Sequence, residues 1–256
     1  MKRMILFRFH TDAAVCRNRL ELLKRHNPGV AIFGLFGGQE DELGRFQAAL
    51  NPYLEDVYCL RGKPPSWKRA HGDLALRSWY QEVGRLVPFD TLHYIEWDLL
   101  LLDPLEKLYG HIPEKGIGLT SLIPLKDIEK RWFWFSEESL RAQWQRLLGF
   151  VKDKYGYSQE PLACEFPGAC MPRGFLEEYS DADVPELCHD ELRVPLFSQV
   201  FGFKLHDTRL CRKWFDEQEQ GFFNCDNKEI GLSTIAEELA KPAGRRAFHP
   251  FRESFV

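Results

Sequence analysis

The chain has 256 residues, of which 44% are hydrophobic and 28% charged. This composition is typical of a folded globular protein and excludes a disordered or collagen-like chain. The formal net charge of -4 provides no bulk positive field, so we expect no nucleic-acid partner.

The first hundred residues alternate between strand-like and helix-like patterns. The predicted strands are 4–9, 30–36, 57–60 and 92–102, and the predicted helices are 12–26, 41–50 and 72–86. This alternation predicts an α/β fold with a mainly parallel central sheet flanked by helices. Sheets of this kind bind ligands at the carboxyl ends of their strands.

The second half of the chain is less regular. The pattern predicts a strand at 116–123, helices at 133–155, 173–179 and 228–240, a turn at Pro167–Gly168, apolar segments at 196–203 and 210–215, and an irregular tail at 241–256. No linker composition and no internal repeat divides the chain. We therefore expect a single domain over 1–256.

Two features bear on the compartment. No window approaches the roughly 18 apolar residues of a membrane span, and the opening segment lacks the apolar stretch and cleavage site of a secretory signal. The seven cysteines are widely spaced and form no CxxC pair, which favours reduced thiols over a zinc cluster. These observations predict a cytoplasmic protein without a transmembrane segment.

The most informative segment is an apolar stretch in which Glu96 and Asp98 flank Trp97. In an extended strand, side chains two residues apart point to the same face. Two adjacent carboxylates are costly to bury without a compensating cation, and they suit a divalent metal. The alternative is a strand end whose acids face solvent.

Several segments, in order, resemble the GT-A fold glycosyltransferases, the nucleotide-diphospho-sugar transferases. The matching segments are the strands and helix at 4–9, 17–26 and 31–35, His71-Gly72-Asp73 with Arg77 and Trp79, the Glu96-Trp97-Asp98 variant of the acidic signature, Pro167 to Arg173, His189-Asp190-Glu191 with Gly202, and Ala247 to Pro250. The resemblance implies a GT-A-like, Rossmann-like domain, with a nucleotide-sugar-binding half at 1–105 and an acceptor-side half at 106–256.

The resemblance also implies an activity. The protein would be a metal-dependent glycosyltransferase that moves a sugar from a nucleotide-diphosphate donor to a glycan or another hydroxyl acceptor. Asp98, Glu96 and His249 would bind Mn²⁺ or Mg²⁺. Because Glu replaces the first Asp of the signature, Glu96 would bind through water or contact the ribose. The alternative for His249 is a histidine of a terminal loop without a partner.

The same resemblance assigns Glu191 as the base that accepts the proton of the acceptor hydroxyl, with Asp190 binding or orienting the acceptor. One carboxylate opposite the leaving group is what inversion by direct displacement requires. The alternative is structural, because Asp190 and Glu191 also suit the N-terminus and first turn of a helix.

The remaining candidates lie toward the donor and the acceptor. Arg8 and His10 follow the first strand and would lie near the base or ribose, while Lys68 and Asp73 would lie along the donor site. A helix N-terminus also explains Asp73. The aromatic run 132–135 would form an acceptor platform or pack in the core.

Two other functions remain open from the sequence. A metal-dependent phosphoester or nucleotide hydrolase would use Glu96, Asp98 and His249 equally well, and a binding protein that keeps the nucleotide-sugar site without turnover would also fit. The sequence contains no Walker-type phosphate loop, no nucleophile elbow and no zincin helix. It leaves the sugar, the base, the acceptor and the oligomeric state open.

Overall fold

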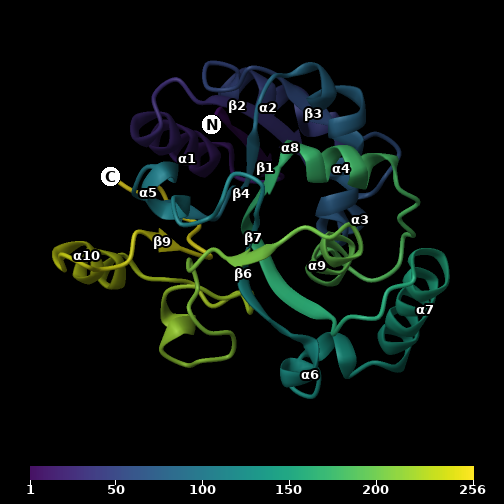
Figure 1. Cartoon of the computed structure of the whole chain (residues 1–256). Helices are drawn as coiled ribbons and strands as arrows, with labels where there is room; N and C mark the ends of the chain where they lie inside the picture. The colour runs from purple at the N-terminus through teal and green to yellow at the C-terminus, as the bar shows by residue number, and fades with distance from the viewer.

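The computed structural model describes residues 1–256, and a seven-stranded sheet in the order β3-β2-β1-β4-β7-β6-β8 runs through its centre (Figure 1). Its strands are β1 (Arg3–Phe9), β2 (Ala31–Phe36), β3 (Val57–Cys59), β4 (Thr91–Glu96), β6 (Ile117–Pro124), β7 (Leu162–Pro172) and β8 (Leu205–Asp207). A separate two-stranded sheet pairs β5 (Leu100–Leu101) with β9 (Ala247–Phe248).

The sheet is mainly parallel. Strands β3, β2, β1 and β4 all run in the same direction, and β6 is parallel to β8. Only β7 is antiparallel to its neighbours β4 and β6. The predicted α/β class and mainly parallel sheet are confirmed. Because β4 pairs with β7, one sheet continues from the first part of the chain into the second.

Helices cover both faces of the sheet, with α1 and α5 on one side and α3, α4 and α9 on the other (Figure 1). The α-helices are α1 (Ala13–His26), α2 (Leu43–Leu50), α3 (Pro65–Ala70), α4 (Gly72–Glu82), α5 (Leu105–Tyr109), α6 (Leu125–Ile128), α7 (Glu138–Tyr155), α8 (Arg173–Asp181), α9 (Asp190–Val200) and α10 (Leu232–Ala240). Residues 4–9 of β1 are all buried, as expected for a strand covered on both faces. None of the helices has the length and apolar run needed to cross a bilayer.

The strand predicted over 92–102 is interrupted. Strand β4 ends at Glu96, a turn follows at Trp97 and Asp98, and the chain resumes as the short β5. The Leu99 amide donates to the Glu96 carbonyl across 3.0 Å, which closes this turn. Glu96 and Asp98 therefore do not share the face of one extended strand, and the turn, rather than strand periodicity, sets their relative positions.

Two further predictions need correction. The turn expected at Pro167–Gly168 lies inside β7, whose residues 163–172 are all buried. Gly168 has a φ of 81°, which bends the strand without ending it. The helix predicted over 133–155 is also shorter. Residues Phe133–Phe135 form a single 3-10 turn, and α7 begins at Glu138.

A buried ion pair joins the helices on one face of the sheet. The Arg193 guanidinium of α9 donates from Nε to Asp73 Oδ2 at 2.8 Å and from Nη2 to Oδ1 at 2.5 Å. Both side chains are fully buried. The Tyr179 hydroxyl of α8 also donates to Asp73 Oδ2. The carboxylate of α4 is therefore satisfied by α8 and α9 and fixes these three helices together.

We expect Arg193→Met to lower the free energy of unfolding by about 3–5 kcal/mol, because it leaves the Asp73 carboxylate buried without its cation. Urea denaturation measures this change. The double variant Asp73→Leu/Arg193→Met should recover much of the loss, since neither charge then remains. The control Lys154→Met removes an exposed partner of Asp183 and should have little effect. An Arg193→Met protein as stable as wild type would show that the pair does not stabilise the fold.

Candidate functional site

Three potential metal ligands meet where β4 ends. Glu96 is the last residue of β4, Asp98 lies in the turn that follows, and His249 comes directly after β9 near the end of the chain. One ligand atom from each lies within 4.8 Å of the others. His249 Nε2 is 3.5 Å from Asp98 Oδ1. The structure therefore brings together the three residues predicted as metal ligands.

Contacts of the C-terminal tail carry His249 to this position. Strand β9 pairs with β5, which follows the Asp98 turn. The Phe251 amide donates to the Asp98 carbonyl at 2.8 Å. From α1, the buried Arg19 guanidinium donates to the Phe251 and Glu253 carbonyls, each at 2.7 Å. These bonds hold the tail on both sides of the ligand.

The three residues fit a divalent cation because each is held by one atom and leaves another available. His249 Nδ1 donates to the Asn224 carbonyl at 2.8 Å, so Nε2 keeps its lone pair. Asp98 Oδ2 is 3.3 Å from Arg252 Nε, whereas Oδ1 is buried without a hydrogen-bond partner. Glu96 accepts from Arg8 through Oε1 at 2.6 Å. One imidazole and two carboxylates form a donor set that Mn²⁺ accepts.

The charges around Asp98 keep it ionised. Burial alone would favour its neutral form, but His249 and then Arg252 lower the pKa of Asp98 to about 2. The same contact raises the pKa of His249 although burial opposes its protonation. Asp98 and the protonated His249 therefore form a buried ion pair, and a cation would take the place of the proton on Nε2.

The residues predicted near the donor have different environments. Arg8 is buried and all its contacts are internal, because Nη2 donates to the Lys68 and Arg69 carbonyls at 2.7 and 3.1 Å. Lys68 is also buried, and its Nζ donates to the Gly38 carbonyl at 3.2 Å. His10 is exposed and lies edge-on to Trp97, with ring centroids 5.5 Å apart.

Asp73 differs from the other donor candidates because its side chain is 0% exposed and its carboxylate is already paired with Arg193. This geometry gives no support to a donor contact by Asp73. Arg8 and Lys68 are buried and support the site through the hydrogen bonds described above. Among the four donor candidates, His10 is the residue with an exposed side chain.

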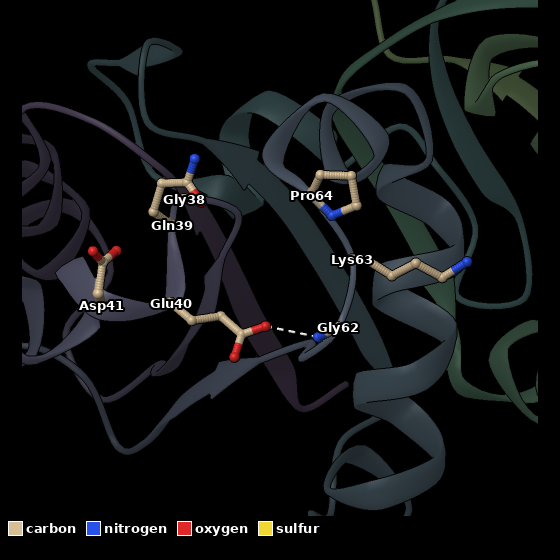
Figure 2. Close-up of a pocket in the computed structure, with 7 residues that line it drawn as sticks. All are labelled: Gly38, Gln39, Glu40, Asp41, Gly62, Lys63 and Pro64. Carbon is tan, nitrogen blue, oxygen red and sulfur yellow. Dashed lines mark hydrogen bonds between the residues drawn. The ribbon is translucent and has the colours of Figure 1, made fainter.

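A hollow of about 450 Å³ lies at the carboxyl ends of β2 and β3 (Figure 2). It is lined by Gly38, Gln39, Glu40, Asp41, Gly62, Lys63 and Pro64. The Gly62 amide donates to Glu40 Oε1 at 2.7 Å and joins its two sides. A chain of hydrogen bonds links the lining of this hollow to Glu96. Lys68 Nζ donates to the Gly38 carbonyl, and Arg8 donates both to the Lys68 carbonyl and to Glu96.

The acid pair lies at the start of α9. Asp190 Oδ2 accepts from the Gly72 amide at 3.2 Å, and Oδ1 accepts from the Glu191 amide at 3.0 Å. Burial, and then the charge of Asp73, raises the pKa of Asp190 to about 7. Burial, and then Asp190, raises the pKa of Glu191 well above its ordinary value. Both acids lie in the first turn of α9, but the N-cap is His189, so Asp190 is not the capping residue that the structural alternative expected. Raised pKa values are typical of groups that transfer protons.

Gly72 separates the acid pair from the ligand-holding arginine. A Cβ atom at this position would lie 2.7 Å from Tyr94 Oη, 2.8 Å from Asp190 Oδ2 and 3.0 Å from Arg8 Nη1. Only glycine fits where these three groups converge. Since Arg8 also bonds Glu96, the structure brings the acid pair and the metal-ligand cluster into one neighbourhood.

Glu165 was not found from the sequence. It lies on β7, is only 2% exposed, and accepts from Ser121 Oγ at 2.7 Å. Burial raises its pKa to about 7, while Ser121 and His249 act in the opposite direction. The available signal was one charged residue within the apolar run 162–171. Its neighbours His249 and Glu191 place it between the two clusters.

The aromatic run 132–135 is partly buried and partly exposed. Trp132 is buried, whereas Phe133 is 60% exposed. Trp134 stacks on His189 with ring centroids 4.0 Å apart and planes 19° apart. The run therefore packs against the residue that precedes the acid pair and also presents one ring to solvent.

Comparisons with known proteins give similarities of structure only. No family model matches the chain, and no curated protein is significantly similar to it in sequence. Similar solved structures include the bifunctional glycosyltransferase WbbM (12% identity, TM-score 0.47, 98% of this chain and 46% of that chain). Others are an active-site mutant of LgtC (14%, 0.42, 80% and 73%) and mouse xyloside xylosyltransferase 1 (10%, 0.42, 100% and 100%). The chain thus spans about half the length of WbbM.

We expect the wild-type protein to bind Mn²⁺, and His249→Ala and Asp98→Ala to weaken this binding at least about 10–100-fold by removing a ligand. Titration followed by the electron paramagnetic resonance signal of free Mn²⁺ measures the affinity. Asp103→Asn is the matched control, because it removes a carboxylate of the same segment that pairs with Lys107 instead. Equal Mn²⁺ affinity for wild type and Asp98→Ala would exclude this ion site.

Glu165 predicts a pH dependence of stability. Its pKa is about 7 when folded and ordinarily 4.5, so between these values the folded protein keeps a proton that the unfolded chain releases. Glu165 therefore lowers the free energy of unfolding as the pH rises from about 4.5 to 7.

Glu165→Gln cannot ionise, so it should match wild type below about pH 4.5 and exceed it above about pH 7, by about 3 kcal/mol at most. Urea denaturation from pH 4 to 8 measures the difference. Glu178→Gln, which removes an exposed carboxylate of α8, controls for net charge. Parallel profiles for wild type and Glu165→Gln would contradict the expectation.

Proposed function

We propose that the protein is a metal-dependent glycosyltransferase that moves a sugar from a nucleotide-diphosphate donor to the hydroxyl of a glycan or another acceptor. The observation that carries this proposal is the gathering of Glu96, Asp98 and His249 within 4.8 Å at the carboxyl end of β4. The acid pair Asp190 and Glu191 lies in the same neighbourhood, across Gly72. The strand order of the sheet supports the GT-A resemblance of the sequence.

The residues of the cluster divide into ligands and supports. Asp98, His249 and Glu96 would hold Mn²⁺ or Mg²⁺, with Glu96 bound directly or through water. When bound, this ion supplies positive charge that stabilises a departing diphosphate. Arg8 fixes the orientation of Glu96, and the Asn224 carbonyl fixes the tautomer of His249.

The nucleoside of the donor would extend from this cluster toward the carboxyl ends of β1 and β2, where parallel sheets bind ligands. The exposed His10 follows β1, and the hollow of Figure 2 follows β2 and β3. Lys68 would support this region through Gly38 rather than by direct contact. Asp73 would act through the placement of α4.

Glu191 would accept the proton of the acceptor hydroxyl, and Asp190 would orient the acceptor. Burial raises the pKa of both carboxyls, so each is a stronger base, once ionised, than an exposed carboxylate. A base that activates the acceptor directly would give inversion at the anomeric carbon. The stereochemistry of the product tests this part of the proposal.

We expect Glu191→Gln to retain donor binding and to lose transfer by about 10²–10⁴-fold, since it removes the base and keeps the shape. Thermal shift with uridine and guanosine diphosphates, with and without Mn²⁺, measures binding, and product formation with a panel of glycosides measures transfer. Glu177→Gln, in α8, is the matched control. Undiminished transfer would remove Glu191 from the role of base.

The same assay separates the alternatives. Release of sugar or phosphate that does not depend on an acceptor would favour the hydrolase, which would use the same three ligands. Metal-dependent nucleotide binding without turnover on any acceptor would favour the binding protein. No stabilisation by any nucleoside diphosphate would contradict the proposed function.

A further inference from the structure

His189 links the aromatic cluster to the acid pair. Its ring is only 3% exposed, stacked on Trp134 at 4.0 Å and edge-on to Trp132 at 5.1 Å. On its other side, Nδ1 lies 3.4 Å from Glu191 Oε2 and 3.9 Å from Asp190 Oδ1. The ring is therefore immobilised by two indoles with one nitrogen directed at the carboxylates.

The second nitrogen of His189 has no role in the fold. Nε2 is buried and has no hydrogen-bond partner. A buried polar atom without a hydrogen-bond partner destabilises the fold. The position of this ring therefore does not serve to give both nitrogens a hydrogen bond. The carboxylates near this ring lie on its other side, where Nδ1 is 3.4 Å from Glu191 Oε2.

The charge states of His189 and Glu191 determine which of the two residues can donate a hydrogen bond to the other. Burial, and then the positive charges of Arg193 and His71, lowers the pKa of His189 well below its ordinary value. The imidazole is therefore neutral at physiological pH and carries one proton. When Glu191 is ionised it has no proton to donate, so the proton of His189 lies on Nδ1.

We propose that His189 is a positioning residue that holds the ionised Glu191 carboxylate in place by donating its Nδ1 proton to Oε2. Trp134 and Trp132 fix the ring and thereby fix the direction of this hydrogen bond. The carboxylate then keeps one oxygen bonded to His189 and the other available to accept a proton. This inference rests on the proposed function for its catalytic meaning, but the hydrogen bond itself does not.

Several titratable groups face Glu191, and all must be considered when its titration is read. Asp190 is its neighbour on α9, Glu165 faces it from β7, and Glu96 faces it from β4. Cys225 also faces it from the segment after β8. The three carboxylates oppose ionisation of Glu191, the backbone of Phe166 favours it, and His189 Nδ1 lies 3.4 Å from Oε2.

The wild-type protein tests the hydrogen bond without any assay of transfer. Nitrogen-15 NMR of labelled histidine distinguishes the two neutral tautomers. Above the titration of Glu191, His189 should be protonated on Nδ1, and Glu191→Gln should shift the Nδ1 resonance more than that of any other histidine. A proton on Nε2 under these conditions would overturn the proposal whether or not the protein transfers sugar.

Matched variants test the effect on Glu191. His189→Phe keeps the stacked ring and removes the donor, so the carboxyl carbon-13 titration of Glu191 should move upward by about 1 pH unit. His189→Asn restores a donor amide and should return most of this shift. His93→Phe is the control, because His93 is also buried, has two unpartnered nitrogens, and packs edge-on against Tyr109 rather than against the acid pair.

Kinetics then separate positioning from structure. If the protein transfers sugar, His189→Phe should lower kcat about 10-fold or more at neutral pH, move the acidic limb of the pH profile upward and leave the KM for donor unchanged. His189→Asn should recover part of the rate. An unchanged Glu191 titration in His189→Phe would overturn the positioning role, whereas a shifted titration without transfer would overturn only the proposed function.

Discussion

The candidate site depends on one buried guanidinium. Arg8, on the central strand β1, donates to Glu96 and to the carbonyls of Lys68 and Arg69. A charged group in this position is tolerated because the Glu96 carboxylate neutralises it and backbone oxygens accept its remaining protons. The same bonds orient Glu96 and hold the C-terminal end of α3, just before α4 begins at Gly72. One side chain therefore links the orientation of Glu96 to the placement of α3.

The second constraint is that the ligands come from opposite ends of the chain. Glu96 and Asp98 follow the fourth strand, whereas His249 arrives on a tail held by β9, Arg19 and Asp98 itself. Arg19 bonds the backbone carbonyls of Phe251 and Glu253, and its guanidinium also lies over the buried Phe251 ring. A ligand delivered in this way can be oriented accurately because the tail is fixed on both sides of His249.

Much of the fold could be predicted because its signals are local. Strand β1 is a continuous apolar run, and α1 shows a clear helical period with a capping Asp12. The break after Glu96 could not be predicted, since Leu99 to Leu102 is as apolar as the strand before it. Pro167–Gly168 was predicted to be a turn because glycine readily adopts a positive φ. A bend inside a strand uses the same conformation, and Gly168 has it within β7.

The sequence predicts those site residues whose type and position in an apolar segment indicate metal binding, as for Glu96 and Asp98. It misses those whose chemistry arises only from burial. Glu165 is an ordinary acid in the sequence, and its raised pKa comes from its surroundings on β7. The internal hydrogen bonds of Arg8 and Lys68 were also not predicted, because they depend on tertiary contacts that no local pattern encodes.

The delivery of His249 by the tail has a consequence for biosynthesis. The sheet strands β1 to β8 are all translated before residue 208, yet the third ligand and the bonds from Arg19 require residues 247–253. A nascent chain can form most of its core on the ribosome while the ion site stays incomplete. The proposed cation site would therefore be complete only after this last segment has emerged and docked.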